Sequence, residues 1–277
     1  MKTNDISIIG LGWLGGPLAK QLAASGYRVR GSVTSMVKKQ QLTTEMPEID
    51  VHCWQVDEQA VLPDSLFAPL MIITIPPGKL SRYFEALQSL VLQAKQRGVQ
   101  HLIYISSTSV YGGAGRCDET TPLMPETAQA ATLVQVEQCV QQAGFLCWNI
   151  LRPAGLIGPH RYPGRFLSGK TLDAGGRAVN LVHQSDVIGT IMALLAQSRC
   201  GIFNLASPDH PTRAEFYQQA CQLAGLPLPI ISDMNNDGKV IDADKVETEL
   251  GYHYQVRDLL AWLQQATAGE QDRKSVV

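Results

Sequence analysis

Four consecutive hydroxyl side chains, Ser106 to Ser109, follow the apolar run HLIYI and precede Val110, Tyr111 and Gly112. Hydroxyl groups donate and accept hydrogen bonds, and a phenol beside them can exchange a proton with a substrate. Buried strands rarely end in so many hydroxyls, so the pattern indicates one wall of an active site. The alternative is that the hydroxyls satisfy only backbone groups and that Tyr111 packs in the core.

A glycine-rich turn lies near the start of the chain, in the segment IIGLGWLGGPLA. Gly10, Gly12 and Gly15 have the spacing of a dinucleotide-binding turn between a strand and a helix. In such a turn the first glycine permits the tight bend, the second admits a pyrophosphate and the third packs helix on strand. We therefore predict cofactor contacts for these glycines and for Trp13 and Leu14 between them. The alternative is a turn that binds nothing.

The second strand indicates which dinucleotide would bind. An acidic residue about 20 positions after the glycine turn would bind the NAD ribose. This chain has Thr34 and Ser35 there, with Lys38 one turn further, and neither Asp nor Glu between positions 5 and 45. Hydroxyls and a lysine suit a 2′-phosphate, so the sequence favours NADP over NAD. The alternative is that Lys38 belongs to a solvated helix face.

Basic residues and a histidine later in the chain are candidates for substrate contacts. Arg161 and Arg165 lie in the segment HRYPGRFLSGK, and guanidinium groups match carboxylates and phosphates. We expect Phe166 to anchor this loop, which could otherwise be merely solvated. His183 precedes a helix and is a further substrate candidate, although a structural histidine is the alternative. Asp186 is expected to cap that helix.

The elements that would position these residues are short apolar strands alternating with helical segments of 10 to 15 residues. This alternation predicts an α/β fold, a doubly wound parallel Rossmann sheet with a smaller C-terminal substrate lobe. The predicted Rossmann core comprises residues 1–155 and 179–206, and the lobe comprises residues 156–178 and 207–265. Residues 266–277 read as a disordered tail.

Composition narrows the classes of partner and location. The 277 residues carry a formal net charge of −2 with scattered basic residues, so we expect neither nucleic acid nor a membrane as partner. No stretch approaches the apolar length of a membrane span, and no secretion signal is apparent. The six cysteines form no C-x-x-C pair and are expected to be reduced thiols in a cytoplasmic protein. No metal site is expected.

Several segments together resemble a known family. SSTSVYG, LRPAGLIGP, VHQSDV, FNLASP and DADKVETELGY occur in the order found in extended short-chain dehydrogenases/reductases of the NAD-dependent epimerase/dehydratase type. The resemblance extends to about Tyr254. The combinations GLGWLG and GRFLSGK are most similar to an atypical bacterial YeeZ-like group.

The resemblance implies roles for residues at the strand ends. It places a catalytic hydroxyl at Ser107, with Thr108 as a further hydrogen-bond donor to the substrate. Tyr111 is a candidate proton donor, although the corresponding tyrosine of the family usually packs. The resemblance also implies cofactor contacts after three strands, at Ile75, Pro76, Ser106, Pro153 and Ala154.

One part of the family pattern is missing. Members carry a tyrosine that exchanges a proton and a lysine, four residues later, that lowers its pKa. Gln129 and Leu133 occupy these positions, and none of the eight tyrosines is followed by lysine at the fourth position. Proton transfer would then have to come from Tyr111, Ser107 or water.

Two functions are compatible with these observations. The first is an NADP-binding, atypical oxidoreductase or epimerase that acts on a small substrate, for which the basic loop suggests an anionic group. The second is a non-catalytic protein that senses NADP and regulates a partner. The resemblance also suggests a homodimer formed through helices near Gln135.

Overall fold

A computed structural model describes residues 4–274, and for residues 267–274 it describes the backbone. The chain divides into two compact units. The first comprises Met1–Val110, Pro125–Arg152 and Ile191–Phe203, and the second comprises Tyr111–Met124, Pro153–Thr190 and Asn204–Val277. Residues 111–124, 153–155, 179–190 and 204–206, which the sequence assigned to the Rossmann core, thus belong to the second unit. Within the described range, no helix is both long enough and apolar enough to cross a membrane.

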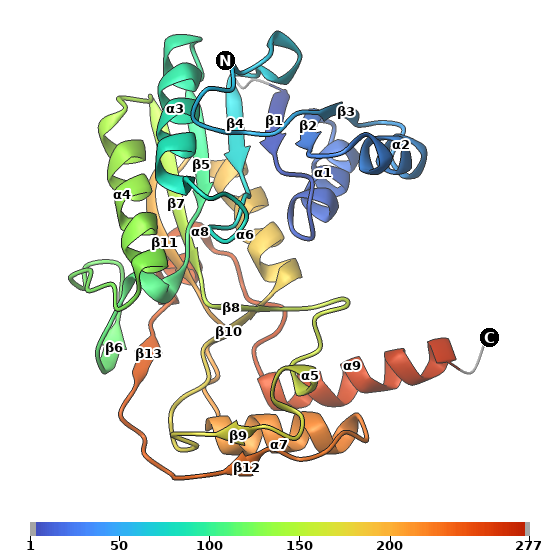
Figure 1. The fold of residues 1–277 in the computed structure, drawn as a ribbon, viewed down its shortest axis with the longest axis vertical. Coiled ribbons are helices and arrows are strands. Elements are labelled where there is room, and N and C mark those ends of the chain that lie inside the picture. The colour runs from blue at the N-terminus through green and yellow to red at the C-terminus, as the bar shows by residue number, and fades with distance from the viewer. Residues whose placement is uncertain (1–3, 275–277) are drawn as a thin grey trace. The chain divides into compact units, whose positions relative to one another are not determined.

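A seven-stranded parallel sheet organises the fold, and its strand order is β11-β7-β5-β4-β1-β2-β3 (Figure 1). The order reverses at β1 and β4, as in a doubly wound sheet, so the predicted fold class is confirmed. The central strands are continuously apolar because helices cover both faces, and all four residues of β4 are buried. The strands are β1 Asp5–Ile9, β2 Arg28–Val33, β3 Asp50–Cys53, β4 Leu70–Ile73, β5 His101–Ile105, β7 Cys147–Pro153 and β11 Gly201–Leu205.

Helices connect successive strands of this sheet. Right-handed crossovers running in opposite directions from the reversal point place their helices on opposite faces. Helices α3 and α4 accordingly lie side by side, away from α1 and α2 (Figure 1). Helices α1, α3 and α4 each bury one apolar stripe, for example Leu18 and Leu22 of α1, whereas α2 buries only Leu42. The helices are α1 Gly15–Ala24, α2 Met36–Glu45, α3 Tyr83–Gln96, α4 Ala128–Gln142 and α6 Gln184–Gln197, with the short 3-10 helices η1 Asp64–Leu66 and η2 Thr108–Val110.

The second unit has its own core and short strand pairs. Tyr162, Phe216, Leu259 and Leu263 are buried together in this core. Strand β10 pairs with β8, β12 with β9 and β13 with β6, all in parallel. Its elements are β6 Gly115–Cys117, β8 Gly155–Ile157, α5 Gly164–Leu167, β9 Thr171–Leu172, β10 Leu181–His183, α7 Arg213–Leu223, β12 Ile230–Ile231, β13 Lys239–Ile241, α8 Asp244–Leu250 and α9 Leu259–Lys274.

The C-terminal helix differs from the sequence-based expectation. Residues 266–277 were predicted as a disordered tail because they are polar and lack an apolar period. In the structure the backbone of α9 stays helical to Lys274. Residues 275–277 lie outside the described range.

The start of α6 holds a distant segment of the same unit. The Asp186 carboxylate is fully buried and accepts hydrogen bonds from the Tyr252 hydroxyl at 2.8 Å and from the backbone N–H of Gln255 at 2.6 Å. The predicted helix-capping role of Asp186 is therefore wrong, because the helix begins two residues earlier, at Gln184. A Cβ at Gly189 would lie 2.4 Å from the Tyr252 ring, so only glycine leaves room for this tyrosine.

A disulfide joins two neighbouring strands. Cys147 at the start of β7 is bonded to Cys200, immediately before β11, and their Cα atoms are 5.4 Å apart. The prediction that all six cysteines are reduced is therefore wrong for this pair. Adjacent parallel strands brought the two residues together across 53 positions of sequence, which no local cysteine spacing reveals. The four remaining cysteines are free thiols: Cys53, Cys117, Cys139 and Cys221.

Candidate functional site

Each of the three predicted glycines is explained by a different structural feature. Gly10 adopts a positive φ of 109°, which favours glycine. A Cβ at Gly15 would lie 2.1 Å from the Gly10 carbonyl oxygen, so α1 could not pack against β1 with a larger residue. A Cβ at Gly12 would meet no atom within 4 Å, so the turn is open at this position. Each glycine thus has the local environment that the dinucleotide motif requires.

Hydrogen bonds hold the turn between two neighbouring strands. The N–H of Gly10 donates to the Ser32 hydroxyl of β2 at 3.1 Å, and its carbonyl accepts from the Thr74 hydroxyl after β4 at 2.6 Å. Helix α1 begins at Gly15, and its N-cap residue, Leu14, provides no side-chain cap. The positive end of the helix is consequently available to an anion.

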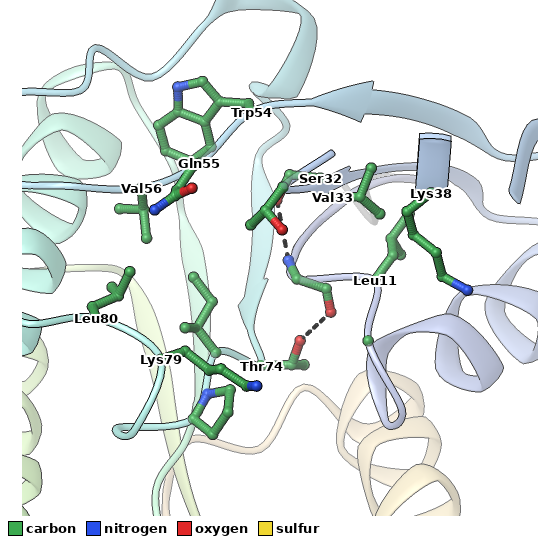
Figure 2. A pocket seen from close by; sticks show the side chains of 15 residues that line it. Leu11, Ser32, Val33, Lys38, Trp54, Gln55, Val56, Thr74, Lys79 and Leu80 are labelled. Atoms are coloured by element: carbon green, nitrogen blue, oxygen red, sulfur yellow. Dashed lines mark hydrogen bonds between the residues drawn. The ribbon is translucent and has the colours of Figure 1, made fainter. Parts of the chain in front are cut away.

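A cavity of about 380 Å³ lies over this turn, entirely within the first unit (Figure 2). Its walls come from the carboxyl ends of β1, β2, β3 and β4, which is where open parallel sheets bind ligands. None of the lining residues within the described chain is acidic. The lining residues are Gly10, Leu11, Gly12, Ser32, Val33, Thr34, Lys38, Trp54, Gln55, Val56, Thr74, Ile75, Pro76, Lys79 and Leu80.

Of the three residues predicted to bind a 2′-phosphate, the structure places two in the cavity and one outside it. Thr34 and Lys38 line the cavity. Ser35 does not line it, because the Ser35 hydroxyl caps α2 by accepting from the N–H of Lys38 at 3.2 Å. The Lys38 ammonium donates to the neutral side chain of Gln41 at 3.2 Å. These residues, with the open turn and uncapped helix, fit a phosphorylated dinucleotide.

The sequence analysis missed nine of the cavity residues: Leu11, Ser32, Val33 and Thr74 beside the glycine turn, and five more that follow β3 and β4. Trp54, Gln55 and Val56 follow β3, and Lys79 and Leu80 follow Ile75 and Pro76 after β4. Residues directly after every strand near the reversal point share this edge of the sheet, and that rule would have found them. Tyr83 fixes the loop after β4, since its hydroxyl donates to the Ile75 carbonyl at 2.7 Å.

The hydroxyl cluster after β5 is mostly engaged with the protein itself. Ser106 is 7% exposed, and its hydroxyl donates to the Glu137 carboxylate at 2.5 Å. The half-buried Ser107 accepts a hydrogen bond from the N–H of Ser109 at 3.1 Å, and Thr108 is buried. None of the predicted residues Ser106, Ser107 and Thr108 lines the cavity described above. Ser107 is the most accessible of the three.

Helix α4 carries a buried ion pair where the family pattern has its lysine. Leu133 is 1% exposed, so no charged group stands at that position. One turn later Glu137 meets Arg152 of β7, with Oε2 2.6 Å from Nη2, and both side chains are at most 2% exposed. Together with Ser106 this pair links α4 to β5 and β7. Gln129 lies close to Gly78, because a Cβ there would be 3.4 Å from the Gln129 amide nitrogen.

Two buried tyrosines lie beneath the same strand ends. The hydroxyls of Tyr83 and Tyr104 are 3.2 Å apart, and burial raises the pKa of both phenols. A raised pKa disfavours the phenolate, and both side chains are at most 4% exposed, which favours a packing role for them. Their shared hydrogen bond instead ties α3 to β5.

Tyr111, in the second unit, is 1% exposed. Its hydroxyl donates to the Asn204 side-chain oxygen at 2.9 Å, and the Lys239 ammonium contacts its carbonyl. Asn204 in turn donates to the Asp242 carbonyl at 3.0 Å. These contacts favour packing as the role of Tyr111, and its catalytic role stays a prediction.

His183 has a defined local environment in the second unit. Its Nδ1 accepts from the Ser185 N–H at 3.2 Å, and the ring centroid lies 5.5 Å from that of Trp262. Burial lowers the pKa of the imidazole, so the neutral form is favoured. The same Nδ1 lies 2.8 Å from the Ser185 hydroxyl. The arrangement matches the structural alternative, and substrate contact stays a prediction.

The basic loop is anchored differently from the expectation. Arg161 and Arg165 are both exposed, whereas Phe166 is 43% exposed and therefore not a buried anchor. Tyr162 takes that role: it is 4% exposed and its hydroxyl donates to the Ala220 carbonyl at 3.0 Å. The exposed arginines fit solvation and anion binding equally.

Pro153 is the last residue of β7, Ala154 follows it, and both are buried. The N–H of Ala154 donates to the Leu205 carbonyl at 2.8 Å, which fixes the backbone there. The predicted contact of these two residues with a nicotinamide stays a prediction. The described residues contain no cluster of three or more His, Cys, Asp or Glu side chains arranged to hold a metal ion.

Comparisons with known proteins agree on the family. Residues 81–205 match the NAD dependent epimerase/dehydratase family. Protein YeeZ of Escherichia coli strain K12 is 40% identical over 271 residues, covering 93% of this chain and 98% of YeeZ. MoeE5, solved with UDP-glucose and NAD, has a TM-score of 0.77 at 21% identity, covering 99% of this chain and 100% of MoeE5. WbmH of Bordetella bronchiseptica, solved with NAD+, has a TM-score of 0.79 at 16% identity, covering 98% and 99%.

Proposed function

This chain belongs to the NAD-dependent epimerase/dehydratase family of extended short-chain dehydrogenases/reductases, and on that premise we propose that it binds NADP and acts as an atypical oxidoreductase or epimerase. The proposed substrate is a small molecule with an anionic group. The observation that carries the proposal is the cavity over the glycine turn: it is open at Gly12, adjoins an uncapped helix N-terminus and has no acidic lining residue.

NADP rather than NAD is the finer part of the proposal. MoeE5 and WbmH were solved with NAD, so the preference rests on this chain's own residues. A carboxylate at the end of β2 would repel a 2′-phosphate, whereas Thr34 and the Lys38 ammonium would bind it. Both residues line the cavity, which supports the assignment.

The chain's own groups define what it can contribute to a reaction. A bound nicotinamide supplies hydride transfer. The Ser107 oxygen accepts from the Ser109 N–H, so its own hydrogen can be donated to a substrate oxygen. The exposed side chains of Arg161 and Arg165, and the His183 imidazole, are the proposed substrate contacts. Proton transfer would come from Ser107, Tyr111 or water; the burial of Tyr111 and its bond to Asn204 favour the other two.

The cofactor proposal is tested by calorimetric titration of the purified protein with NADPH and with NADH. We expect wild type to bind NADPH roughly tenfold or more tightly than NADH, because a charge-assisted hydrogen bond to phosphate contributes about this factor. Lys38→Met should remove the difference by weakening NADPH alone. Lys39→Met, a neighbouring lysine outside the cavity, is the matched control. Equal binding of both cofactors by wild type would contradict the NADP assignment.

A second function is favoured by one specific observation. The family resemblance assigns the proton-transfer pair to positions 129 and 133, which carry glutamine and a buried leucine in this chain. A protein that binds NADP without turnover would act as a sensor of the cofactor pool. NADPH oxidation assayed against small anionic carbonyl compounds separates the two functions. Turnover supports the enzyme; binding without turnover, with NADPH-dependent changes in surface amide exchange, supports the sensor.

Partners and location complete the proposal. The homodimer near Gln135 rests on the family resemblance. The cytoplasmic location is likewise a proposal, and the Cys147–Cys200 bond removes the cysteine argument for it. Static light scattering would test the first, and cell fractionation the second. We propose no nucleic acid or membrane partner, because the net charge is only −2.

A further inference from the structure

The cavity over the glycine turn holds a second cation besides Lys38. Lys79 lies in the loop between β4 and α3 and lines the cavity. Figure 2 shows its side chain extending toward Thr74. We propose that Lys79 binds the half of the dinucleotide that lies beyond the adenosine, at its second phosphate and second ribose. The inference rests on the proposed function and assigns a specificity-determining residue to that site.

The sheet order places the two lysines on opposite sides of the turn. The glycine turn follows β1, Lys38 follows β2, and Lys79 follows β4; the order is β4-β1-β2. Figure 2 agrees, with Lys38 and Lys79 on either side of Ser32 and Thr74, the two residues bonded to Gly10. A pyrophosphate at the helix N-terminus is therefore flanked by one cation on each side. If Lys38 binds the adenosine 2′-phosphate, Lys79 faces the other end of the dinucleotide.

The loop that carries Lys79 is held in place. The Tyr83 hydroxyl binds the Ile75 carbonyl at 2.7 Å, and the N–H of Lys79 donates to the Pro76 carbonyl at 3.3 Å. Two consecutive prolines further restrict the backbone. Across the loop Gly78 closely approaches Gln129 of α4. A fixed loop lowers the entropy lost when an exposed lysine binds a ligand.

The charge of Lys79 meets no opposite charge among the side chains that the structure describes. Within residues 4–266 its ammonium takes part in no ion pair and no hydrogen bond, and the cavity lining contains no carboxylate. A lysine that is merely solvated would not have to lie in a cavity that lacks acidic residues. An anion is the ligand chemistry that this arrangement favours.

The experiment compares three probes by calorimetry. The first, 2′,5′-ADP, has the adenosine with its 2′- and 5′-phosphates, but it lacks the second phosphate of the pyrophosphate and the second ribose. The second, 2′-phospho-ADP-ribose, has both, and NADPH adds the nicotinamide. We expect Lys79→Met to weaken 2′-phospho-ADP-ribose and NADPH roughly tenfold and 2′,5′-ADP less than about twofold. Lys38→Met should weaken all three, and the matched control Lys39→Met none.

The outcomes separate this inference from the proposed function. Wild type that binds no probe overturns both. A second outcome overturns the role of Lys79 alone. In it wild type binds the probes, but Lys79→Met either loses no affinity or loses as much affinity for 2′,5′-ADP as for the larger probes. If wild type prefers NAD, the same comparison uses AMP, ADP-ribose and NADH, with the loss expected only for the last two. Lys38 and Lys79 are exposed and Lys39 is half-buried, and circular dichroism and denaturant unfolding of each variant check that folding is retained.

Discussion

At the scale of single residues, the glycine turn shows which functional features a sequence can reveal. Gly10, Gly12 and Gly15 were identified by spacing, and the structure gives each a separate reason: a positive φ, an open approach and a close helix–strand contact. Backbone constraints of this kind depend on neighbours within a few positions. Side-chain partners do not, which is why the commitment of Ser106 to Glu137 was invisible in the sequence.

The turn supplies a residue-scale prediction. Gly12→Val should leave the protein folded, because a Cβ there meets nothing within 4 Å, but should abolish dinucleotide binding by blocking the pyrophosphate. Gly15→Val should lower the free energy of unfolding by about 3 kcal/mol or more, because its Cβ would overlap the Gly10 carbonyl. Denaturant unfolding and calorimetry of both variants provide the measurements. Normal binding by folded Gly12→Val would show that the pyrophosphate lies elsewhere.

At the scale of elements, a buried ion pair fixes helix α4 to the sheet. The Arg152 guanidinium and the Glu137 carboxylate are at most 2% exposed, and the Ser106 hydroxyl completes the network. A buried charge without its partner is strongly destabilising, although an apolar pair of similar size often is not. The ion pair thus holds α4 in register against β5 and β7, close to the hydroxyl cluster.

A double-mutant cycle tests this role. Glu137→Leu or Arg152→Met alone should lower the free energy of unfolding by about 3 to 5 kcal/mol, because each leaves one buried charge unpaired. The combined variant should be more stable than either single variant, because no unpaired charge remains. Urea unfolding of the four proteins provides the values. Additive losses would mean that the two side chains do not interact in this way.

Helix α6 shows where element-scale prediction fails. Asp186 was expected to cap a helix because acidic residues favour first turns. The structure instead uses the carboxylate as acceptor for Tyr252 and Gln255, about seventy positions later. The sequence locates the helix correctly, but the partner of a buried carboxylate depends on tertiary packing.

At the scale of the whole molecule, strand alternation sufficed to predict the doubly wound sheet, because each apolar run must be covered on both faces. The boundaries of the units were harder, since residues 111–124 and 179–190 pack with the second unit although the Rossmann pattern suggested otherwise. The cavity residues Trp54 and Lys79 carry no motif and became apparent only when the strand ends were brought together. The disulfide likewise follows from strand adjacency.

The Cys147–Cys200 bond supplies the prediction at this scale. Without reductant, unfolded protein should show four reactive thiols, and after reduction six. Reduction should lower the free energy of unfolding by up to about 4 kcal/mol, because the cross-link restricts a loop of 53 residues in the unfolded chain. The Cys147→Ser/Cys200→Ser variant should be equally stable with and without reductant. Six reactive thiols in the unreduced protein would contradict the bond.

The contact between Gly189 and Tyr252 restricts how these two positions can vary among related proteins. Any side chain at position 189 would collide with an aromatic ring at position 252. Substitutions at the two positions are therefore coupled. A smaller residue must first replace Tyr252, and only then can a larger residue replace Gly189. A relative with alanine or serine at 189 should have a small residue at 252, and its carboxylate at position 186 should then have lost the hydroxyl it binds here.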